Sequence, residues 1–330
     1  FVVVGLLAAL LAFQVPLKAW QRAAPYLFIL GAMLLVAVLV PVLGKQVNGS
    51  KRWLSLYLVN LQPSELMKLF VVLYAASYAV RKASFLHAEQ PLRQTLLKGF
   101  LPLLAVMIAI SALLLHEPDF GACVVIVAIA FGILFLGGLD WRLLIGLGFL
   151  LPVALWLMIR FAPYRLQRFT GFLDPWSDPL GKGYQLTHSL IAFGRGEWFG
   201  VGLGASVEKL LYLPEAHTDF LLAVIAEELG FAGVTLVVAL FAWLLVRAYA
   251  IGRQAARLEK PFAALVAHGI GLWRGVQTFI NIGVTLGALP TTGLPLTLLS
   301  FGGRGIRADT VRLASLRRGA SWQRRVRGAS

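Results

Sequence analysis

Long apolar stretches, separated by short polar connections, constrain the fold of this chain more than any other feature of its sequence. A helix needs about 20 apolar residues to cross the hydrocarbon core of a bilayer. Because lipid offers no hydrogen-bond partner to the backbone, each stretch must be helical. Charged residues make up only 14% of the chain, against about 25% in an ordinary soluble domain. We therefore predict an all-α fold, a polytopic transmembrane helical bundle.

The apolar runs predict about eight complete spans. They lie near Val2–Phe13, Tyr26–Leu43, Leu66–Val80, Phe100–Leu115, Phe120–Leu136, Leu143–Ile159, Phe220–Val246 and Phe262–Leu289. The chain opens at Phe1 inside an apolar run, without a Met or the basic start of a signal peptide. We therefore expect the natural amino terminus, with at least one further span, to lie upstream.

Lysine and arginine gather in alternate connections, which the positive-inside rule assigns to the cytoplasm. These residues are Lys18, Arg22, Arg81, Lys82, Arg93, Lys98, Arg142, Arg247, Arg253, Arg257 and Lys260. The other connections, including the long segment Ala162–Thr218, are then extracytoplasmic. This topology explains the net charge of +15 better than nucleic-acid binding does, because the basic residues follow no single amphipathic face.

Several familiar sites are absent from the sequence. It has no Walker phosphate loop, no dinucleotide-binding glycine motif, no HExxH and no GxSxG. The sequence therefore gives no support to ATP-driven transport or to hydrolysis by a serine or zinc enzyme, and we expect no nucleotide cofactor. A single cysteine, Cys123, excludes an intrachain disulfide framework and a cysteine-built metal cluster.

The extracytoplasmic loop 162–218 is the longest polar segment. A loop of this length is usually functional or disordered. Its aromatic residues, which include Trp176, Phe193 and Trp198, argue against disorder. We predict that it folds onto the outer face of the membrane, with aromatic side chains at the level of the lipid headgroups.

The segment from Tyr212 to Phe220 directly precedes a long apolar span and is the most informative stretch of the chain. Pro214 ends any preceding helix, Thr218 can cap the next, and Asp219 then lies in its first turn. The carboxylate can stabilise the positive end of the helix dipole. Alternatively it is a general base, since partial desolvation raises the pKa of a carboxylate toward neutrality.

Charged residues inside apolar spans are costly unless they face a cavity or a partner. Glu227 and Glu228 lie about two turns into one span, and Arg274 lies inside the last complete span. We expect Arg274 to pair with a buried acid or to line a cavity. These residues, with Glu215, Glu117 and Asp119 of the outward segments, are candidate supporting groups for a site. Metal binding and simple turn formation both remain open for Glu117 and Asp119.

Outward cations depart from the positive-inside trend, and a lipid carrying a pyrophosphate would need such groups to hold its anion. The alternative is anchoring to lipid headgroups. With His217, the candidates are Lys51, Arg52, Arg165, Arg168, Arg195 and Lys209. Asp174 and Asp178 could supply oxygen ligands to a divalent cation, although capping of a turn is the favoured explanation.

A series of motifs resembles the SEDS family (shape, elongation, division and sporulation proteins). In family order they are Asn48–Trp53, Gln62–Glu65, Glu117–Gly121, Asp174–Trp176 with Gly183–Gln185, Ala192–Gly196, Pro214–Phe220 and Leu289–Gly293. The resemblance covers residues 1–303 and is closest to the division branch of the family rather than the elongation branch.

This resemblance implies a ten-helix fold and a peptidoglycan glycosyltransferase that polymerises lipid II at the outer face of the bacterial cytoplasmic membrane, at the division septum. It implies that Asp219 deprotonates the 4-hydroxyl of the acceptor sugar. It also implies a divalent cation, Mg²⁺ or Mn²⁺, beside the leaving pyrophosphate. The implied partners are a class B penicillin-binding protein (FtsI-like transpeptidase), other divisome proteins and membrane lipids, with no nucleic acid. A lipid II flippase, a scaffold and an elongation polymerase are the alternatives.

Two departures from the family pattern concern the ends of the chain. The chain begins at the family's second span, and the start of the family's tenth helix, Gly-Gly-Ser-Ser, here reads Gly302-Gly303-Arg304-Gly305. Residues 304–330 are rich in arginine and contain few large apolar residues. We therefore expect one transmembrane domain over residues 1–303, followed by a basic tail that is aberrant or disordered.

Overall fold

The computed structural model describes residues 10–11, 14–40, 44–47, 50–56, 59–86, 91–149, 171–296 and 299. It divides the chain into two compact units, which are considered separately. The first contains residues 1–144, 245–274 and 303–330, and the second contains residues 145–244 and 275–302. Two long helices, α11 (Leu221–Arg257) and α12 (Pro261–Thr285), each contribute to both units.

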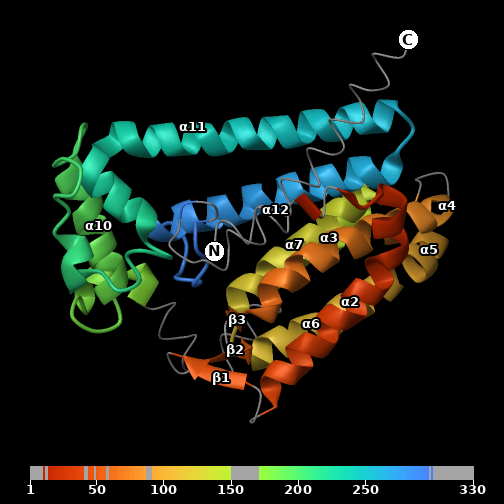
Figure 1. Ribbon diagram of the computed structural model, residues 1–330, viewed down its shortest axis with the longest axis horizontal. Coiled ribbons are helices and arrows are strands. Elements are labelled where there is room, and N and C mark those ends of the chain that lie inside the picture. Colours follow the sequence, from red (N-terminus) through yellow and green to blue (C-terminus); the bar gives the residue numbers. More distant parts are fainter. Residues whose placement is uncertain are drawn as a thin grey trace. The chain divides into compact units, whose positions relative to one another are not determined.

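Four apolar helices form the first unit together with the shared helix ends (Figure 1). They are α2 (Leu17–Leu39), α3 (Pro63–Arg81), α6 (Leu101–His116) and α7 (Phe120–Leu136). The short helices α4 (Ala83–Leu86), α5 (Leu92–Gln94) and the π-helix η1 (Thr95–Phe100) connect α3 to α6. Pro63 starts α3 at a position where a missing N–H costs nothing.

Helix α3 is the centre of this unit because it packs against both α2 and α7. Gly31 permits the close approach of α2, since a Cβ atom there would lie 2.6 Å from Met67 Sδ and 2.8 Å from Phe70 Cδ2. Both of these side chains are buried. The side chains of α2 on its other faces are largely exposed, as expected of a helix that meets lipid.

A small antiparallel sheet, with strand order β1-β2-β3, lies between α2 and α3 in the sequence. Its strands are β1 (Gly44–Val47), β2 (Ser50–Leu56) and β3 (Val59–Leu61). Gly44 pairs with Leu54, and Leu54 pairs with Leu61. The sequence analysis did not predict these strands. The Asn48-Gly49 pair between β1 and β2, a strong hairpin signal, could have indicated them.

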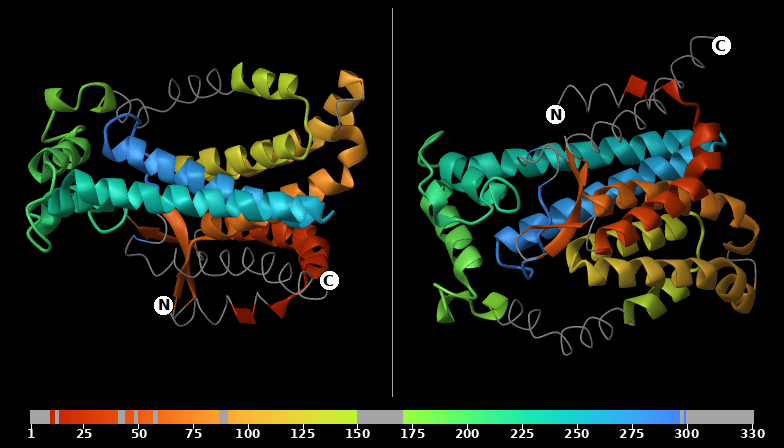
Figure 2. Two further views of the ribbon diagram at one scale, coloured as in Figure 1. Left: turned by 90° about the horizontal axis from the view of Figure 1, so that it is seen from above. Right: turned by 60° about the horizontal axis from the view of Figure 1, so that its bottom comes forward.

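The second unit contains the described part of the loop 162–218 and the adjoining ends of the two long helices. The loop forms a 3₁₀ turn η2 (Pro175–Ser177), helix α10 (Tyr184–Gly196) and a π-helix η3 (Glu208–Tyr212). Figures 1 and 2 show α10 beside the first turns of α11. The core of this unit is formed by Leu222, Phe241 and Leu296, with Phe193 of α10 packed against them.

The predicted spans correspond well to the observed helices. Phe120–Leu136 is confirmed to the residue, whereas α2 begins at Leu17 rather than Tyr26 and α11 continues to Arg257 rather than Val246. Helices extend beyond the apolar window because Lys and Arg are good helix formers in water. Helix α2, residues Leu92–His116 and α11 are long and apolar enough to cross a membrane. The predicted span Val2–Phe13 and the second half of Leu143–Ile159 lie almost entirely outside the described residues, as does the tail 304–330.

Candidate functional site

Asp219 lies in a turn, residues 214–220, that precedes α11. The prediction that it belongs to the first helical turn, capped by Thr218, is therefore wrong, because α11 begins at Leu221. Thr218 Oγ1 instead donates to a carboxylate oxygen of Glu215 at 2.6 Å, and Glu215 has a φ of 57°. Buried Ala216 and Phe220 hold the turn against the protein. Asp219 is half-buried, whereas Glu215 and His217 are exposed on the same turn.

The side chain of Asn281, on α12, holds this turn in place. Its Nδ2 donates to the backbone oxygen of Asp219 at 2.7 Å and to the backbone oxygen of Leu294 at 2.8 Å. The segment after α12 therefore lies next to Asp219. A Cβ atom on Gly293 would be 3.8 Å from Asp219 Oδ2. Two chain segments thus meet at the carboxylate.

Glu227 is fully buried in α11 and connects that helix to the loop 162–218. Its carboxylate accepts hydrogen bonds from Ser206 Oγ at 2.5 Å and from the backbone N–H groups of Val207 and Glu208 at 3.1 and 3.3 Å. Arg195 Nη1 lies 3.2 Å from Glu227 Oε1. These partners offset the cost of burying the charge.

The neighbouring Glu228 pairs with Lys209. Two of the cations predicted to hold a pyrophosphate, Arg195 and Lys209, therefore each contact a carboxylate of α11. The side chain of Arg195 is still 43% exposed, so it can also face a ligand. Both pairs attach the loop to the helix that follows Asp219.

A backbone connection reinforces these ion pairs. Helix α11 is interrupted at Gly230, whose φ of 64° and ψ of −162° are not helical. The freed groups bond the loop: Phe231 N–H donates to Glu197 O at 2.8 Å, and Val201 N–H donates to Glu227 O at 2.9 Å. Gly200 completes the connection, because its φ of 80° and its proximity to the Glu228 backbone leave no room for a side chain.

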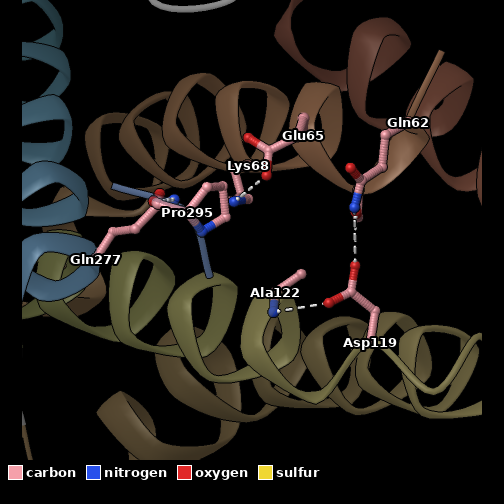
Figure 3. Close-up of polar contacts among 8 residues, drawn as sticks. Gln62, Glu65, Lys68, Asp119, Ala122, Gln277 and Pro295 are labelled. Atoms are coloured by element: carbon pink, nitrogen blue, oxygen red, sulfur yellow. Dashed lines mark hydrogen bonds and ion pairs between the residues drawn. The ribbon is translucent and has the colours of Figure 1, made fainter. Parts of the chain in front are cut away.

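The acidic turn between α6 and α7 belongs to the first unit. Asp119 caps α7 by accepting from Ala122 N–H at 3.2 Å, and its other oxygen accepts from Ser64 Oγ at 2.8 Å and Gln62 Nε2 at 3.4 Å (Figure 3). Arg52 donates to the backbone oxygens of Glu117 and Pro118. Burial, followed by the charge of Asp119, raises the pKa of Glu117 to about 8, although Arg52 opposes the shift.

Two buried cations of the first unit lie against one indole ring. The Arg274 guanidinium and Lys68 Nζ are each 5.7 Å from the centre of the Trp273 ring. Lys68 also pairs with Glu65 at 2.6 Å (Figure 3). Cation–π contacts of desolvated groups are worth about 2 kcal/mol. They account in part for the tolerance of Arg274 within an apolar helix.

The contacts of Asp174 and Asp178 are those of a turn. An Asp178 oxygen accepts from Lys182 N–H at 3.1 Å, and the backbone oxygen of Asp174 accepts from Ser177 Oγ at 2.8 Å. Among the described residues, no three His, Cys, Asp or Glu side chains converge on a common point. This donor set does not fit a metal cage built by the protein, and their role as ligands stays a prediction.

A cavity of about 390 Å³ adjoins the turn of Asp219 within the second unit. Its polar lining comes from Lys182, Tyr184, Gln185 and Thr291, and Pro214 of the turn forms part of its wall. Thr291 belongs to the segment held by Asn281. A concave site with a few convergent polar groups is a candidate binding site for a small molecule.

The side chains of three of the predicted cations lie outside the part of the chain that the structure describes. Arg165 and Arg168 lie outside the described residues, as does the side chain of Lys51. The structure thus brings together Glu227 with Arg195, and Glu228 with Lys209, while Glu215 and His217 belong to the same turn as Asp219.

Sequence reasoning missed a polar stripe on α12. Gln277, Asn281 and Thr285 follow each other at four-residue spacing and are all buried. Gln277 Nε2 donates to Pro295 O at 3.2 Å, and Thr285 O accepts from Ser189 Oγ of α10 at 2.8 Å. The rule that singled out Glu227 and Arg274, that polar groups inside an apolar span need partners, would have found these residues too.

A histidine in α10 was also missed. His188 Nδ1 lies 2.7 Å from Glu208 Oε2, and the His188 ring packs between Tyr184 and Tyr212 at centroid distances of 4.4 and 6.4 Å. Tyr184 lines the cavity. The four-residue spacing of Tyr184 and His188 on α10 could have indicated their contact. The sequence offers no such signal for Glu208 and Tyr212, because they come from a separate part of the loop.

Comparison with known proteins gives consistent results. The model of the FtsW/RodA/SpoVE family, described as cell cycle protein, matches residues 1–318. A probable peptidoglycan glycosyltransferase FtsW from Aromatoleum aromaticum is 60% identical over 98% of this chain and 77% of its own length. Another from Nitrosomonas europaea is 51% identical over 99% of this chain and 82% of its own length.

Solved structures extend the comparison. A chain of a peptidoglycan synthase complex that coordinates polymerization and crosslinking is 30% identical, with a TM-score of 0.75 over 96% of this chain and 87% of that one. The rod shape determining protein RodA of Thermus thermophilus is 28% identical, with a TM-score of 0.66 over 96% of this chain and 83% of that one.

Proposed function

Because the chain belongs to the FtsW/RodA/SpoVE family, we propose that it is a peptidoglycan glycosyltransferase that polymerises lipid II at the outer face of the bacterial cytoplasmic membrane. It is a multi-pass membrane protein. Its relatives at 51–60% identity carry the name FtsW, whereas the elongation protein RodA is 28% identical. This difference favours a role in cell division at the septum over a role in elongation.

Asp219 is the proposed general base. Its carboxylate takes the proton of the acceptor's 4-hydroxyl, and that oxygen forms a bond to the anomeric carbon of the donor sugar. The bond from this carbon to the pyrophosphate breaks, and the polyprenyl pyrophosphate leaves with the electron pair. The observation that supports this role is the anchoring of Asp219 between α11 and the 291–296 segment, beside a polar cavity. A base acts efficiently only when it is fixed near the proton it removes.

Cations of the extracytoplasmic loop are proposed to hold the pyrophosphate. Arg195 remains 43% exposed despite its pairing with Glu227, and Lys182 lines the cavity. A divalent cation, Mg²⁺ or Mn²⁺, would offset the charge of the leaving pyrophosphate. Mg²⁺ usually binds through substrate phosphates with one or two carboxylates, so the lack of a three-residue cluster among the described residues does not conflict with it.

The proposed partner is a class B penicillin-binding protein, an FtsI-like transpeptidase that crosslinks the new strands. The structural neighbour from a peptidoglycan synthase complex supports such a pairing. Other divisome proteins and membrane lipids complete the environment, and no nucleic acid is expected. A flippase or a scaffold would not need a fixed carboxylate at the outer face.

The test is glycan-strand formation from purified lipid II by the chain together with its transpeptidase partner. Asp219→Asn keeps the shape of the side chain but removes the base, and a loss of roughly a hundredfold or more is expected. Glu197→Gln is the matched control, because Glu197 is an exposed acid of the same loop. Polymerisation by Asp219→Asn at the wild-type rate would reject the general-base role, whereas absence of polymerisation by the wild type would favour a flippase or a scaffold.

A further inference from the structure

The amide of Asn281 connects the two chain segments that meet at Asp219. One of its hydrogens bonds the backbone oxygen of Asp219 at 2.7 Å, and the other bonds the backbone oxygen of Leu294 at 2.8 Å. These acceptors belong to the turn before α11 and to the segment after α12. Asn281 itself lies on α12, with 1% of its surface exposed. The bond to Leu294 is buried and the bond to Asp219 is part-buried. Hydrogen bonds are stronger in such low-dielectric surroundings than in water.

This bridge needs a side chain with two donors, which the amide of Asn281 supplies. A carboxylate would place acceptors against two carbonyl oxygens, and an apolar side chain would leave both carbonyls without this donor. Among the described residues, Asn281 Oδ1 has no hydrogen-bond partner, and a buried unpaired acceptor costs stability. The contribution of this residue therefore lies in its donors rather than in its general fit to the core.

We infer that Asn281 is a positioning residue that fixes the Asp219 carboxylate for proton transfer, an inference that rests on the proposed function. Asn281 holds the backbone of Asp219 itself and also the segment that carries Gly293, whose backbone faces Asp219 Oδ2. The carboxylate is thereby oriented from two sides. Small displacements of a reacting group are enough to lower a catalytic rate a hundredfold.

The chain offers a matched control on the same helix face. Gln277, four residues before Asn281, donates to Pro295 O at 3.2 Å. This bond attaches the same segment after α12 but does not include Asp219. Loss of Gln277 therefore tests general anchoring of the segment, and loss of Asn281 tests anchoring of the segment together with the carboxylate.

The experiment measures lipid II polymerisation by the full chain with its transpeptidase partner for Asn281→Leu, Asn281→Asp, Asn281→Gln and Gln277→Leu. We expect kcat to fall at least about tenfold in Asn281→Leu and Asn281→Asp, with KM for lipid II changed less than about twofold. Asn281→Gln keeps both donors and should recover part of the rate. Gln277→Leu should keep kcat within about threefold of the wild type.

Thermal unfolding of each variant in detergent distinguishes a rate lost through misplacement of Asp219 from a rate lost because the variant is unfolded. Asn281→Asp, the closest in shape, provides the kinetic comparison if Asn281→Leu does not fold. Equal loss of kcat in the Gln277 and Asn281 variants, or kcat unchanged in Asn281→Asp, would overturn the inference. If Asp219→Asn is inactive in the same assay while Asn281→Asp is not, the proposed function stands and only the positioning role is rejected.

Discussion

Glu117 shows how a single side chain acquires its chemistry from its surroundings. It lies in the turn between α6 and α7, with 1% of its surface exposed, and among the described residues its Oε1 has no hydrogen-bond partner. Burial, and then the charge of Asp119, disfavour its ionised form. Asp119, only two residues away, receives hydrogen bonds from Ser64 and Ala122. Within one turn, Asp119 therefore caps α7, whereas burial favours the neutral form of Glu117.

The protein should lose stability as pH rises, because of Glu117. Its pKa rises from 4.5 to about 8 on folding, so the folded state binds more protons than the unfolded state between these values. The contribution is fully present below pH 4.5 and is lost as pH rises through about 8. In detergent, the midpoint of thermal unfolding of the wild type should fall between about pH 5 and about pH 9.

Glu117→Gln should flatten this dependence, because glutamine has no proton to lose. The exposed Glu259→Gln is the control and should follow the wild-type curve. A Glu117→Gln curve parallel to that of the wild type over the whole pH range would show that another group causes the dependence.

At the scale of the element, the break in α11 at Gly230 connects the helix to the loop. A continuous helix would satisfy its own backbone groups and leave none for the loop. The break frees the carbonyl of Glu227 and the N–H of Phe231, and the 197–202 segment bonds both. The adjacent side chains of Glu227 and Glu228 contact Arg195 and Lys209 from the same loop. One helical defect thus organises the loop that precedes Asp219.

Gly230→Ala should destabilise the protein by about 1–3 kcal/mol, since this backbone conformation is essentially restricted to glycine. An added Cβ would also lie 2.6 Å from Phe199 N. The matched control is Gly194→Ala in α10, where the new Cβ meets nothing within 4 Å and a helical alanine is favourable by about 0.5–1 kcal/mol. Thermal unfolding of both variants checks this difference. Equal stability of the two would contradict the role assigned to Gly230.

At the scale of the whole molecule, the chain contains one natural probe of its core. Cys123 is its only cysteine, and it is buried in α7 with 8% of its surface exposed. Helix α7 packs against the central α3. The thiol therefore becomes accessible only when the packing of the first unit is lost.

A membrane-permeant maleimide should label Cys123 at least about a hundredfold more slowly in the native protein than after denaturation, because labelling then requires opening of the unit. The temperature at which labelling accelerates should coincide with the loss of helical circular dichroism. An added surface thiol, Ser177→Cys, is exposed and supplies the reference rate. Equal labelling rates at both positions in the folded protein would show that α7 is not buried as described.

The sequence by itself determined most of the helical spans that the structure describes, and the family. The apolar run Phe120–Leu136 became a helix with those bounds, because hydrophobicity and the need to satisfy the backbone in lipid are properties of the local chain. The motifs also indicated Asp219 as the central candidate. The short sheet was missed because its strands, of 4, 7 and 3 residues, are too short to be recognised as apolar spans.

Only the tertiary structure decided which polar groups meet. From the sequence, Arg195 and Lys209 were unpaired outward cations, and Asn281 was an unremarked residue of an apolar span. Their partners, Glu227, Glu228 and the backbone of Asp219, are brought to them by the break in α11 and by the turn before it. Hydrogen bonds and ion pairs depend on contact distances of a few ångströms. Such distances are set by packing between remote segments and not by local sequence.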